Sequence, residues 1–295
     1  MVNKQGILLY ARNNAQIDYV KQAVFLAERA KEYLNLPVTL VTDSIDYVDA
    51  NYSQQKSLFD SVIPMTFDGN SHGRAVQSMS ENHSVRSFYD GSLASKQLEW
   101  KNNIRCTAFD ASPYEETLLL DTDIVISNSN WCRCFEQKHD FLIYQHCTEL
   151  LDTDRGDIFR RISDTSVDFY WATAVFFRKT AENQIFFDLV AHIQQNWQHY
   201  CRIFQINTPY FRNDYAFSIA IHIMNGYQTG DFAKPMPGTL YFATDKSILW
   251  QIDQEDMVFL LEKQKHVGEY TAVRTSQSNV HVLNKFSLNR CIDAG

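Results

Sequence analysis

Apolar runs and amphipathic stretches alternate at the start of the chain. Residues 6–10 form an apolar run that predicts a buried strand, and residues 16–34 carry apolar side chains at near-helical spacing. Residues 38–42 predict a second strand. A strand, a helix and a strand in this order predict parallel strands joined by a right-handed crossover. Because ligands of such sheets bind beyond the carboxyl ends of the strands, residues 10–13 and 42–44 are the first candidates for binding groups.

The later part of the chain continues this alternation. The elements predicted after residue 60 are a short strand at 61–64, a long loop at 66–95, a helix at 98–110, strands at 117–120 and 168–178, and helices at 182–200 and 214–225. Gly226 stands where a helix C-terminus favours glycine. The last fifty residues alternate only weakly. The pattern predicts one α/β domain with a mixed sheet and C-terminal additions.

Composition narrows the class of protein. Of the 295 residues 45% are apolar, which is enough for a substantial core. No apolar run approaches the ~20 residues that a membrane-spanning helix needs, and the first residues lack the apolar stretch of a signal peptide. These features, with six scattered cysteines that suggest neither a disulfide framework nor a zinc site, predict a cytoplasmic protein. The net charge of −8 lowers the expectation of a protein that holds nucleic acid through its overall charge.

The segment with the clearest chemistry is Leu120-Asp121-Thr122-Asp123, which follows a buried strand. In an extended chain, residues two apart project to the same side, so Asp121 and Asp123 can present both carboxylates to one point. Two like charges beside a buried strand are costly unless a cation or strong donors offset them. A divalent ion completed by substrate phosphates meets this need, so the motif predicts a site for a metal and a diphosphate.

Three other interpretations of the motif stay open. Two aspartates can simply end a strand in solvent. The segment 121–125 also fits the nucleophile motif of phosphatases similar to the haloacid dehalogenases, in which the first Asp is phosphorylated. Those enzymes place the motif near the N-terminus and add a later Gly-Asp-x-x-x-Asp motif, a pattern that Gly156-Asp157 and Gly230-Asp231 do not complete. The third alternative is a non-catalytic module that binds a nucleotide, a nucleotide sugar or a glycan without turnover.

The chain resembles the GT-A-fold glycosyltransferases, which are nucleotide-diphospho-sugar transferases. It is similar to their glycogenin-like branch and to related proteins of tailed phages. The resemblance is carried by the opening strand-helix-strand, by the segment 112–123, by Arg212-Asn213-Asp214-Tyr215-Ala216-Phe217-Ser218, and by Val280-His281-Val282-Leu283-Asn284-Lys285. These features span nearly the whole chain. The resemblance implies a single GT-A (Rossmann-like) domain, with a nucleotide-binding half at 1–126 and an acceptor-binding half at 127–295.

The resemblance also implies a metal centre. Asp121 and Asp123 would contact Mn²⁺ or Mg²⁺, and His281 resembles the late histidine that completes the coordination sphere. Imidazole suits Mn²⁺ better than Mg²⁺. Lys285 would meet the diphosphate as it leaves. A lone histidine is as often a packed or surface imidazole, which is the alternative for His281.

Asp214 resembles the family's acidic residue on the acceptor side, and it is the predicted catalytic residue. In an inverting enzyme this carboxylate takes the proton of the acceptor hydroxyl. The alternative is structural, because Asp is favoured in the first turn of a helix. The family usually has an acidic residue just before this Asp, whereas this chain has Asn213.

The remaining candidates would contact the nucleotide. Arg105 stands where related enzymes have a basic residue near the phosphates, and a guanidinium suits bidentate contact with phosphate. The residues predicted to bind the base, the ribose or the diphosphate besides Arg105 and Lys285 are Tyr10, Ala11, Arg12, Thr42, Asp43 and Thr122. Residues 169–174, which are aromatic here, occupy the place of a loop that is often glycine-rich in the family.

These features together predict a metal-dependent transfer of a sugar from a nucleoside diphosphate donor, a UDP-sugar by preference, to an acceptor hydroxyl. The phage relatives implied by the resemblance suggest a hydroxymethylated base in DNA as acceptor, while a glycan, a lipid or a protein is the alternative. A face able to stack bases is predicted beside Asp214, from Tyr200, Arg202, Phe204, Tyr210, Phe211 and Arg212. The same residues could be a core edge or a carbohydrate platform, and both retaining and inverting transfer remain open.

Overall fold

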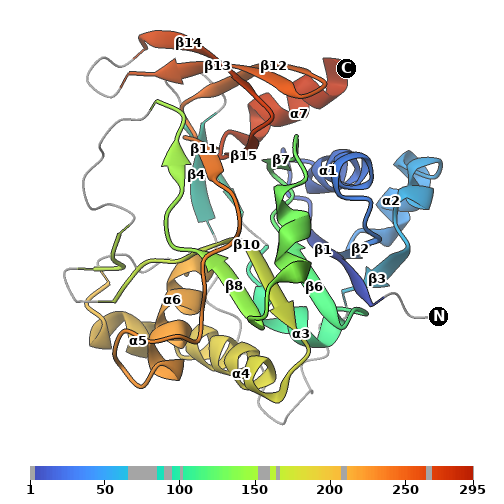
Figure 1. Cartoon of the computed structure of the whole chain (residues 1–295). Coiled ribbons are helices and arrows are strands. Elements are labelled where there is room, and N and C mark those ends of the chain that lie inside the picture. Colours follow the sequence, from blue (N-terminus) through green and yellow to red (C-terminus); the bar gives the residue numbers. More distant parts are fainter. Residues whose placement is uncertain are drawn as a thin grey trace.

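The structure is a computed structural model. It describes residues 4–65, 85–89, 95–99, 102–151, 160–163, 167–206, 211–263 and 268–294. A central sheet carries helices against it, and the C-terminal strands and helix lie at one end of the molecule (Figure 1). Among the described residues, no helix combines the length and the apolar character that a membrane span requires.

The central sheet has six strands in the order β3-β2-β1-β6-β10-β8. The strands are β1 (Gln5–Ala11), β2 (Val38–Thr42), β3 (Ser61–Pro64), β6 (Glu116–Leu120), β8 (Phe141–Tyr144) and β10 (Trp171–Arg178). β1 pairs in parallel with β2 and β6, and β2 pairs in parallel with β3, whereas β10 is antiparallel to both β6 and β8. This arrangement confirms the predicted mixed, mainly parallel sheet. Strands from both predicted halves of the chain share it.

The first strand, helix and strand form the predicted unit. Every residue of β2 and β6 is buried, as continuous apolar runs require in a sheet covered on both faces. Helix α1 (Tyr19–Leu34) begins where the Asp18 side chain accepts a hydrogen bond from the Lys21 backbone N–H, and ends at Asn35 in the left-handed conformation. It packs on β1 and β2. The short helix α2 (Ile45–Asn51) follows β2.

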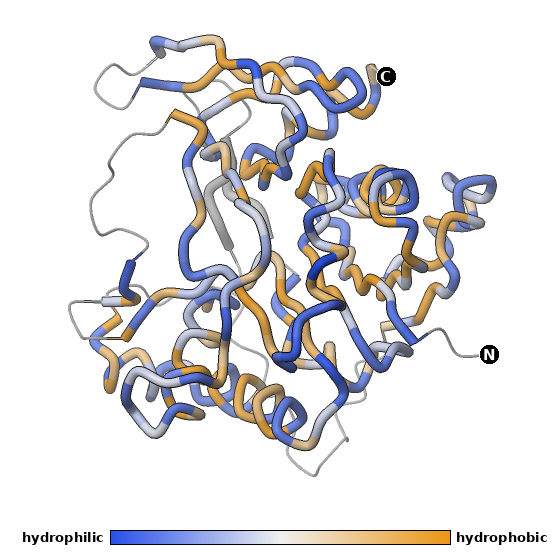
Figure 2. The backbone as a smooth tube through the Cα atoms, in the orientation of Figure 1, coloured by the Kyte–Doolittle hydropathy of each residue, from blue (hydrophilic) through white to orange (hydrophobic). Residues whose placement is uncertain are grey.

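A second group of helices lies beside β10. It contains α3 (Ala108–Ala111), α4 (Ala181–Gln195), α5 (Trp197–Ile203) and α6 (Asn213–Met224). α6 packs against both α4 and β10. Phe186 and Phe217 pack edge to face with ring centroids 5.4 Å apart, so aromatic burial holds α4 to α6. In Figure 2 the tubes of these helices carry both apolar and polar residues, and the strands of the central sheet are largely apolar. Gly226 has φ of +71° just after α6, as its position predicted.

The last part of the chain builds two further sheets. β7 (Ile124–Val125), β9 (Thr148–Glu149), β11 (Leu240–Ala243) and β15 (Asn279–Val282) form one, in the order β7-β15-β11-β9. β12 (Ile248–Asp253), β13 (Asp256–Glu262) and β14 (Tyr270–Ser276) form an antiparallel meander, and α7 (Lys285–Ala294) packs on β12. Met257, Phe259 and Leu288 belong to a small core between the meander and α7.

Several local predictions are wrong. Residues 98–99 lie in β5 (Ser95–Glu99), which pairs with β4 (Val85–Tyr89), so the predicted helix at 98–110 shrinks to a 3-10 turn at Arg105–Thr107 followed by α3. β4 also interrupts the predicted loop at 66–95, most of which lies outside the described residues. The helix predicted at 182–200 is broken at Asn196, which caps α4 and begins α5. In each case strand pairing or helix capping satisfies backbone hydrogen bonds, and the periodicity of apolar side chains does not reveal these partners.

Candidate functional site

Asp121 and Asp123 lie on a short turn that joins two sheets. β6 of the central sheet ends at Leu120, and β7 of the second sheet begins at Ile124. The Asp121 backbone N–H donates to the Thr173 carbonyl oxygen at 2.8 Å, and the Asp123 carbonyl oxygen accepts from the Val282 N–H at 2.8 Å. Both ends of the turn are therefore fixed. The carboxylates come together through this turn and not through the extended conformation that the sequence suggested.

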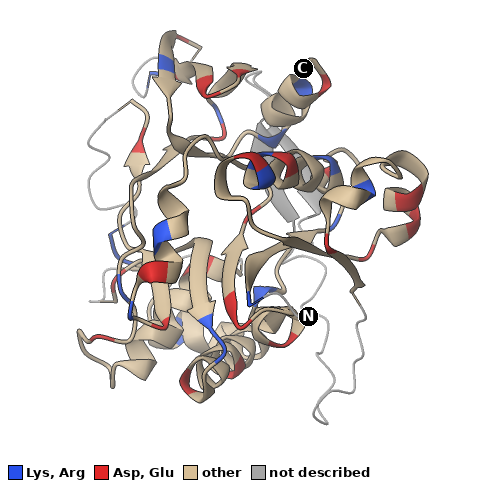
Figure 3. Cartoon of the chain, turned by 45° about the vertical axis from the view of Figure 1, so that its right-hand side comes forward, with Lys and Arg blue, Asp and Glu red and all other residues tan. Residues whose placement is uncertain are grey.

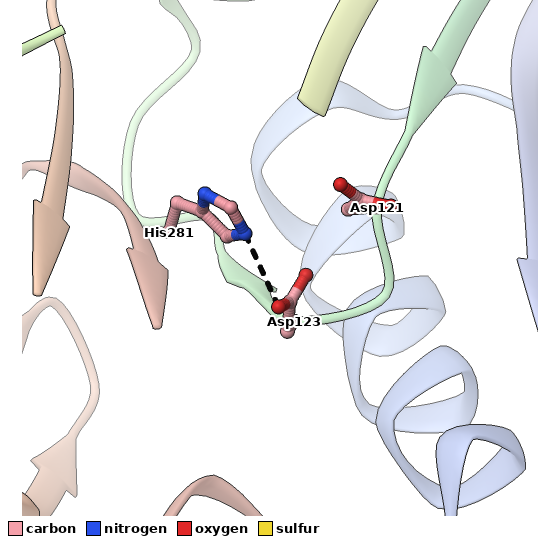
Figure 4. A group of neighbouring side chains, drawn as sticks. All are labelled: Asp121, Asp123 and His281. Carbon is pink, nitrogen blue, oxygen red and sulfur yellow. Dashed lines mark hydrogen bonds and ion pairs between the residues drawn. The ribbon is translucent and has the colours of Figure 1, made fainter. Parts of the chain in front are cut away.

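His281 reaches the same point from the opposite end of the chain. β15 pairs with β7 so that His281 faces Ile124, the residue after Asp123. His281 Nε2 lies 3.1 Å from Asp123 Oδ2, and the nearest ligand atoms of Asp121, Asp123 and His281 lie within 4.8 Å of one another (Figure 4). Two carboxylates and one imidazole at this spacing suit a divalent ion such as Mn²⁺. The three residues predicted as metal ligands are thus brought together.

Lys285 completes the charge balance around Asp123. Its Nζ donates to Asp123 Oδ2 at 2.5 Å and to the Leu283 carbonyl oxygen at 3.2 Å. Burial by itself works to raise the pKa of Asp123, but the charges and hydrogen bonds of His281 and Lys285 outweigh it and hold this pKa well below the ordinary range. Asp123 therefore stays ionised and available to a cation throughout the neutral range.

Arg105 is the partner of Asp121, although here burial outweighs the guanidinium and the pKa of Asp121 is raised. Its guanidinium is almost fully buried, and Nη2 donates to Asp121 Oδ1. Among the described residues, no partner is found for the buried Nη1 of Arg105. A buried charged donor without an acceptor is costly, so such a group usually meets a ligand or water. Arg105 can therefore hold Asp121 and still offer a donor to an anion.

These groups line a cavity of about 130 Å³, which we call the first cavity. The predicted residues that line it are Tyr10, Arg105, Asp121, Thr122, Asp123, Asp214, His281 and Lys285. The first cavity brings together the carboxyl ends of β1 and β6, the start of β10, and the N-terminus of α6. It therefore lies beyond the carboxyl ends of two parallel strands, where α/β sheets place their ligands.

Asp214 lies in the first turn of α6, but its carboxylate does not cap that helix. Oδ1 accepts from the Ala172 backbone N–H at 3.0 Å, and Oδ2 accepts from Arg212 Nη2 at 2.7 Å. Asp214 thus occupies the first-turn position that the structural alternative predicts, while its side chain reaches across to β10. Beside it, Asn213 donates through Nδ2 to the Asn102 carbonyl oxygen at 3.2 Å, and no partner is found for its buried Oδ1 among the described residues.

The other predicted nucleotide contacts divide into two groups. The Tyr10 hydroxyl lies 2.9 Å from Thr107 Oγ1, and Tyr10 lines the first cavity. The described lining does not include Ala11, Arg12, Thr42 or Asp43. Arg12 Nε donates to Asp43 Oδ2 at 2.9 Å, so these two side chains pair with each other across the ends of β1 and β2. Their contact with a nucleotide stays a prediction.

The sequence assigned no metal, nucleotide or catalytic role to half of the lining. These residues are Tyr19, Asn102, Trp171, Ala172, Thr173, Arg212, Asn213 and Leu283, of which Arg212 was predicted for the stacking face alone. Trp171, Ala172 and Thr173 belong to a strand whose apolar pattern indicates core, and they are indeed buried. Asn102 precedes the Asp-x-Asp turn by nineteen positions, and no spacing signals it. Asn213 and Arg212 adjoin the predicted Asp214, and this adjacency could have identified them as lining residues.

The predicted stacking face does not form as an exposed surface. Phe204 and Phe211 are buried, and Tyr200 is half-buried with its ring parallel to that of Phe204 at 6.3 Å. Arg212 turns onto Asp214 and Tyr215. Tyr210 lies outside the described residues. Tyr200, Phe204 and Phe211 thus belong to a core edge, which was one of the alternatives open from the sequence, whereas Arg202 is exposed.

Comparison with known proteins gives structural similarities alone. No protein-family model and no curated protein matches the chain. It is similar to the glycosyltransferase GlyE of Streptococcus pneumoniae TIGR4, at 10% identity and a TM-score of 0.39, over 75% of this chain and 43% of that one. It is also similar to the galactosyltransferase LgtC in complex with donor and acceptor sugar analogues, at 10% identity and a TM-score of 0.45, over 72% of this chain and 70% of that one.

A third similar structure is mouse xyloside xylosyltransferase 1 in its apo form, at 12% identity and a TM-score of 0.43, over 78% of this chain and 84% of that one. The chain spans less than half the length of GlyE. At this level of identity no residue role is transferred from these proteins to this chain.

Proposed function

We propose that the protein is a metal-dependent glycosyltransferase that moves a sugar from a nucleoside diphosphate, UDP by preference, to an acceptor hydroxyl. The observation that carries this proposal is the convergence of Asp121, Asp123 and His281 in one cavity with Arg105 and Lys285. Carboxylates and imidazole suit a divalent cation, and the guanidinium and ammonium suit phosphate oxygens. A metal and a diphosphate together need this combination of groups.

The residues of the chain have separable tasks in this reaction. Asp121, Asp123 and His281 would hold Mn²⁺ or Mg²⁺. The bound ion would neutralise the negative charge that develops on the diphosphate as the sugar leaves. Arg105 and Lys285 donate to the phosphate oxygens, and Thr122 and Tyr10 border the nucleotide. The charge that develops on the leaving group thus meets fixed donors, which lowers the barrier to transfer.

Asp214 is proposed to meet the acceptor. It lines the same cavity from α6, and the backbone N–H of Ala172 and the side chain of Arg212 hold its carboxylate in place. Each carboxylate oxygen keeps a second lone pair that can accept a hydrogen bond from a hydroxyl. Asp214 can therefore orient the acceptor hydroxyl and take its proton if the transfer inverts the sugar.

The acceptor is proposed to be a glycan rather than DNA. Of the described residues of the stacking face on which the DNA hypothesis depends, Phe204 and Phe211 are buried and do not offer their rings to a base. In the view of Figure 3, Lys and Arg alternate with Asp and Glu over the elements. With a net charge of −8 the chain offers little general attraction to a duplex.

The test is calorimetric and thermal titration of the purified protein with nucleoside diphosphates and nucleotide sugars, with and without Mn²⁺. A ligand of the native state raises the melting temperature. We expect one nucleotide to bind only with the metal, and Asp123→Asn to abolish this binding. Asp49→Asn, on the surface of α2, is the matched control and should behave as wild type.

The alternatives give different results. A phosphatase of the haloacid dehalogenase type would need no nucleotide and would release phosphate from small phosphate esters. A non-catalytic module would bind the nucleotide sugar without hydrolysing or transferring it. Absence of any metal-dependent nucleotide binding would overturn the proposed function.

A further inference from the structure

A second cavity, of about 210 Å³, lies along α6 away from the first one. Its walls are Asp168 and Tyr170, residues of the second half of α6 with Asn225 just after it, and the loop 227–230. None of the residues that line the first cavity lines the second. The second cavity is therefore a separate hollow that the proposed function does not use.

Hydrogen bonds fix its walls. The Ser218 hydroxyl accepts from the Tyr170 backbone N–H at 2.8 Å and donates to the Asp214 carbonyl oxygen at 2.6 Å. The Asn225 side chain accepts from the Phe232 N–H at 3.0 Å, and the Tyr227 N–H donates to the His222 carbonyl oxygen at 2.9 Å. The cavity thus has a preformed shape, as binding sites usually have.

Tyr227 has an unusual backbone and an unusual exposure. Its φ is +64°, a conformation that costs a non-glycine residue about 1–2 kcal/mol, and its side chain is 66% exposed. The neighbouring His222 ring packs edge-on against it, with centroids 5.8 Å apart. Strained backbone that carries an exposed aromatic ring into the wall of a cavity points to a role in binding rather than in stability.

The lining matches a neutral ligand with many hydroxyl groups. Asp168 is the only Asp, Glu, Lys or Arg among the described lining residues, so none of these residues offers a cationic partner to a phosphate. The carboxylate of Asp168 and the side chains of Tyr170, His222 and Asn225 can exchange hydrogen bonds with hydroxyls. A sugar ring has both hydroxyls at its rim and an apolar C–H face that can lie on the Tyr227 ring.

The two cavities lie along the same face of one helix. Asp214, Ser218 and His222 are spaced by four residues, so they share a face of α6. Eight residues of helix separate Asp214 from His222, which corresponds to about 12 Å. A short oligosaccharide can span this distance. Residues 170–172 run beside α6 between the two cavities, hydrogen-bonded to Ser218 at one end and to Asp214 at the other.

We propose that the second cavity binds a sugar unit of a neutral oligosaccharide acceptor, remote from the hydroxyl that reacts at Asp214. This inference rests on the proposed function, because that function supplies the need for an acceptor. It assigns the acceptor to the glycan class. It also means that the protein recognises an oligosaccharide by more than its terminal sugar.

The test is saturation-transfer NMR on the wild-type chain without metal or nucleotide, with lactose, maltotriose, cellotriose, xylotriose and chitotriose as probes. We expect at least one probe to bind. Tyr227→Ala and Asp168→Asn should each weaken that binding by about tenfold, and Tyr227→Phe, which keeps the ring, should retain it. Trp250→Ala is the matched control, since Trp250 is 63% exposed on the distant meander and its loss should leave binding unchanged.

The outcomes separate the two proposals. If no probe binds, or if binding survives in both Tyr227→Ala and Asp168→Asn, the second cavity is not a sugar site. If a hydroxymethylated DNA duplex shows saturation transfer that Tyr227→Ala abolishes, the glycan assignment is overturned. Mn²⁺-dependent nucleotide binding, titrated separately in the same variants, should stay at the wild-type level. Its absence from the wild type would overturn the proposed function while leaving a Tyr227-dependent sugar site in place.

Discussion

Lys285 Nζ lies 2.5 Å from Oδ2 of Asp123, on the oxygen that also faces His281 Nε2. The ammonium therefore neutralises the carboxylate at the place where a metal would bind. α7 begins at Lys285, so the last helix delivers this charge to a turn more than 160 residues earlier in the chain. Metal and ammonium compete for one carboxylate, whereas a diphosphate would attract both.

We predict that Lys285→Gln lowers the affinity for a nucleoside diphosphate in the presence of Mn²⁺ by about 10- to 100-fold, equal to about 1.4–2.8 kcal/mol. The affinity for Mn²⁺ alone should not fall, because the competing cation is gone. Isothermal titration of metal and nucleotide in turn measures both. A parallel loss of the two affinities would contradict this division of roles.

Arg105→Lys tests the buried guanidinium. Lysine keeps the charge but cannot hold Asp121 and present a second donor in one plane. We expect nucleotide affinity to fall by about tenfold, while Mn²⁺ binding changes little. Arg133→Lys, an exposed substitution of the same kind, is the control. Wild-type nucleotide affinity in Arg105→Lys would show that Nη1 meets no ligand.

Asp214→Asn tests the acceptor side. Removal of a catalytic base costs about 10²- to 10⁴-fold in rate, so transfer should slow by at least the lower figure. Donor binding should stay within twofold of wild type, because Asp214 does not belong to the metal cluster. Asp188→Asn, on the exposed side of α4, should have no effect on either measurement. Unchanged transfer in Asp214→Asn would leave Asp214 with a structural role alone.

Glu116 links three strands of the central sheet. It accepts from Arg178 Nε at 2.8 Å on β10 and from Gln5 Nε2 at 2.6 Å on β1. Burial works to raise its pKa, but these partners prevail and lower it. Because the folded-state pKa lies below the unfolded value of about 4.3, the stabilisation is complete above that pH and is lost as the pH falls through the folded-state pKa.

Glu116→Gln should therefore lower the free energy of unfolding at pH 7 by about 1–3 kcal/mol. The difference from wild type should shrink below about pH 4.3, where the wild-type carboxylate is progressively protonated. Urea unfolding at several pH values measures this. A difference that did not depend on pH would refute the role of the charge, and Glu136→Gln, which is exposed, serves as the control.

Gly6 permits the close approach of Tyr114 to β1. A Cβ at this position would overlap the ring carbons of Tyr114, whose hydroxyl lies 2.8 Å from Thr39 Oγ1. Because Tyr114 is buried and tied at its far end, Gly6→Ala should destabilise the fold by about 1–3 kcal/mol in thermal or denaturant unfolding. In a double-mutant cycle, Tyr114→Leu should relieve part of this cost. Strict additivity of the two changes would show that the ring is not the obstacle.

The sequence by itself determined the mainly parallel sheet and the pair of carboxylates directly after a buried strand. Residues 6–10, 38–42 and 117–120 are short runs of apolar and β-branched side chains, and a strand buried on both faces leaves that signature regardless of its partners. Asp121 and Asp123 were evident because two charges directly after such a run need a counter-charge. The metal cluster with His281 was predictable only through the family resemblance, since 158 positions separate His281 from Asp123.

Only the tertiary structure decided what surrounds these carboxylates. Pairing between β7 and β15 places His281 opposite Ile124, and the turn before α3 buries Arg105 beside Asp121. The carboxylate of Asp214, predicted from its motif, is held in place by the Ala172 backbone N–H and the Arg212 side chain. Such contacts join segments far apart in the chain, and the spacing of residues along a sequence carries no information about them. Local periodicity therefore fixed the strands and the main helices, while the packing of sheets and helices against one another decided the two cavities.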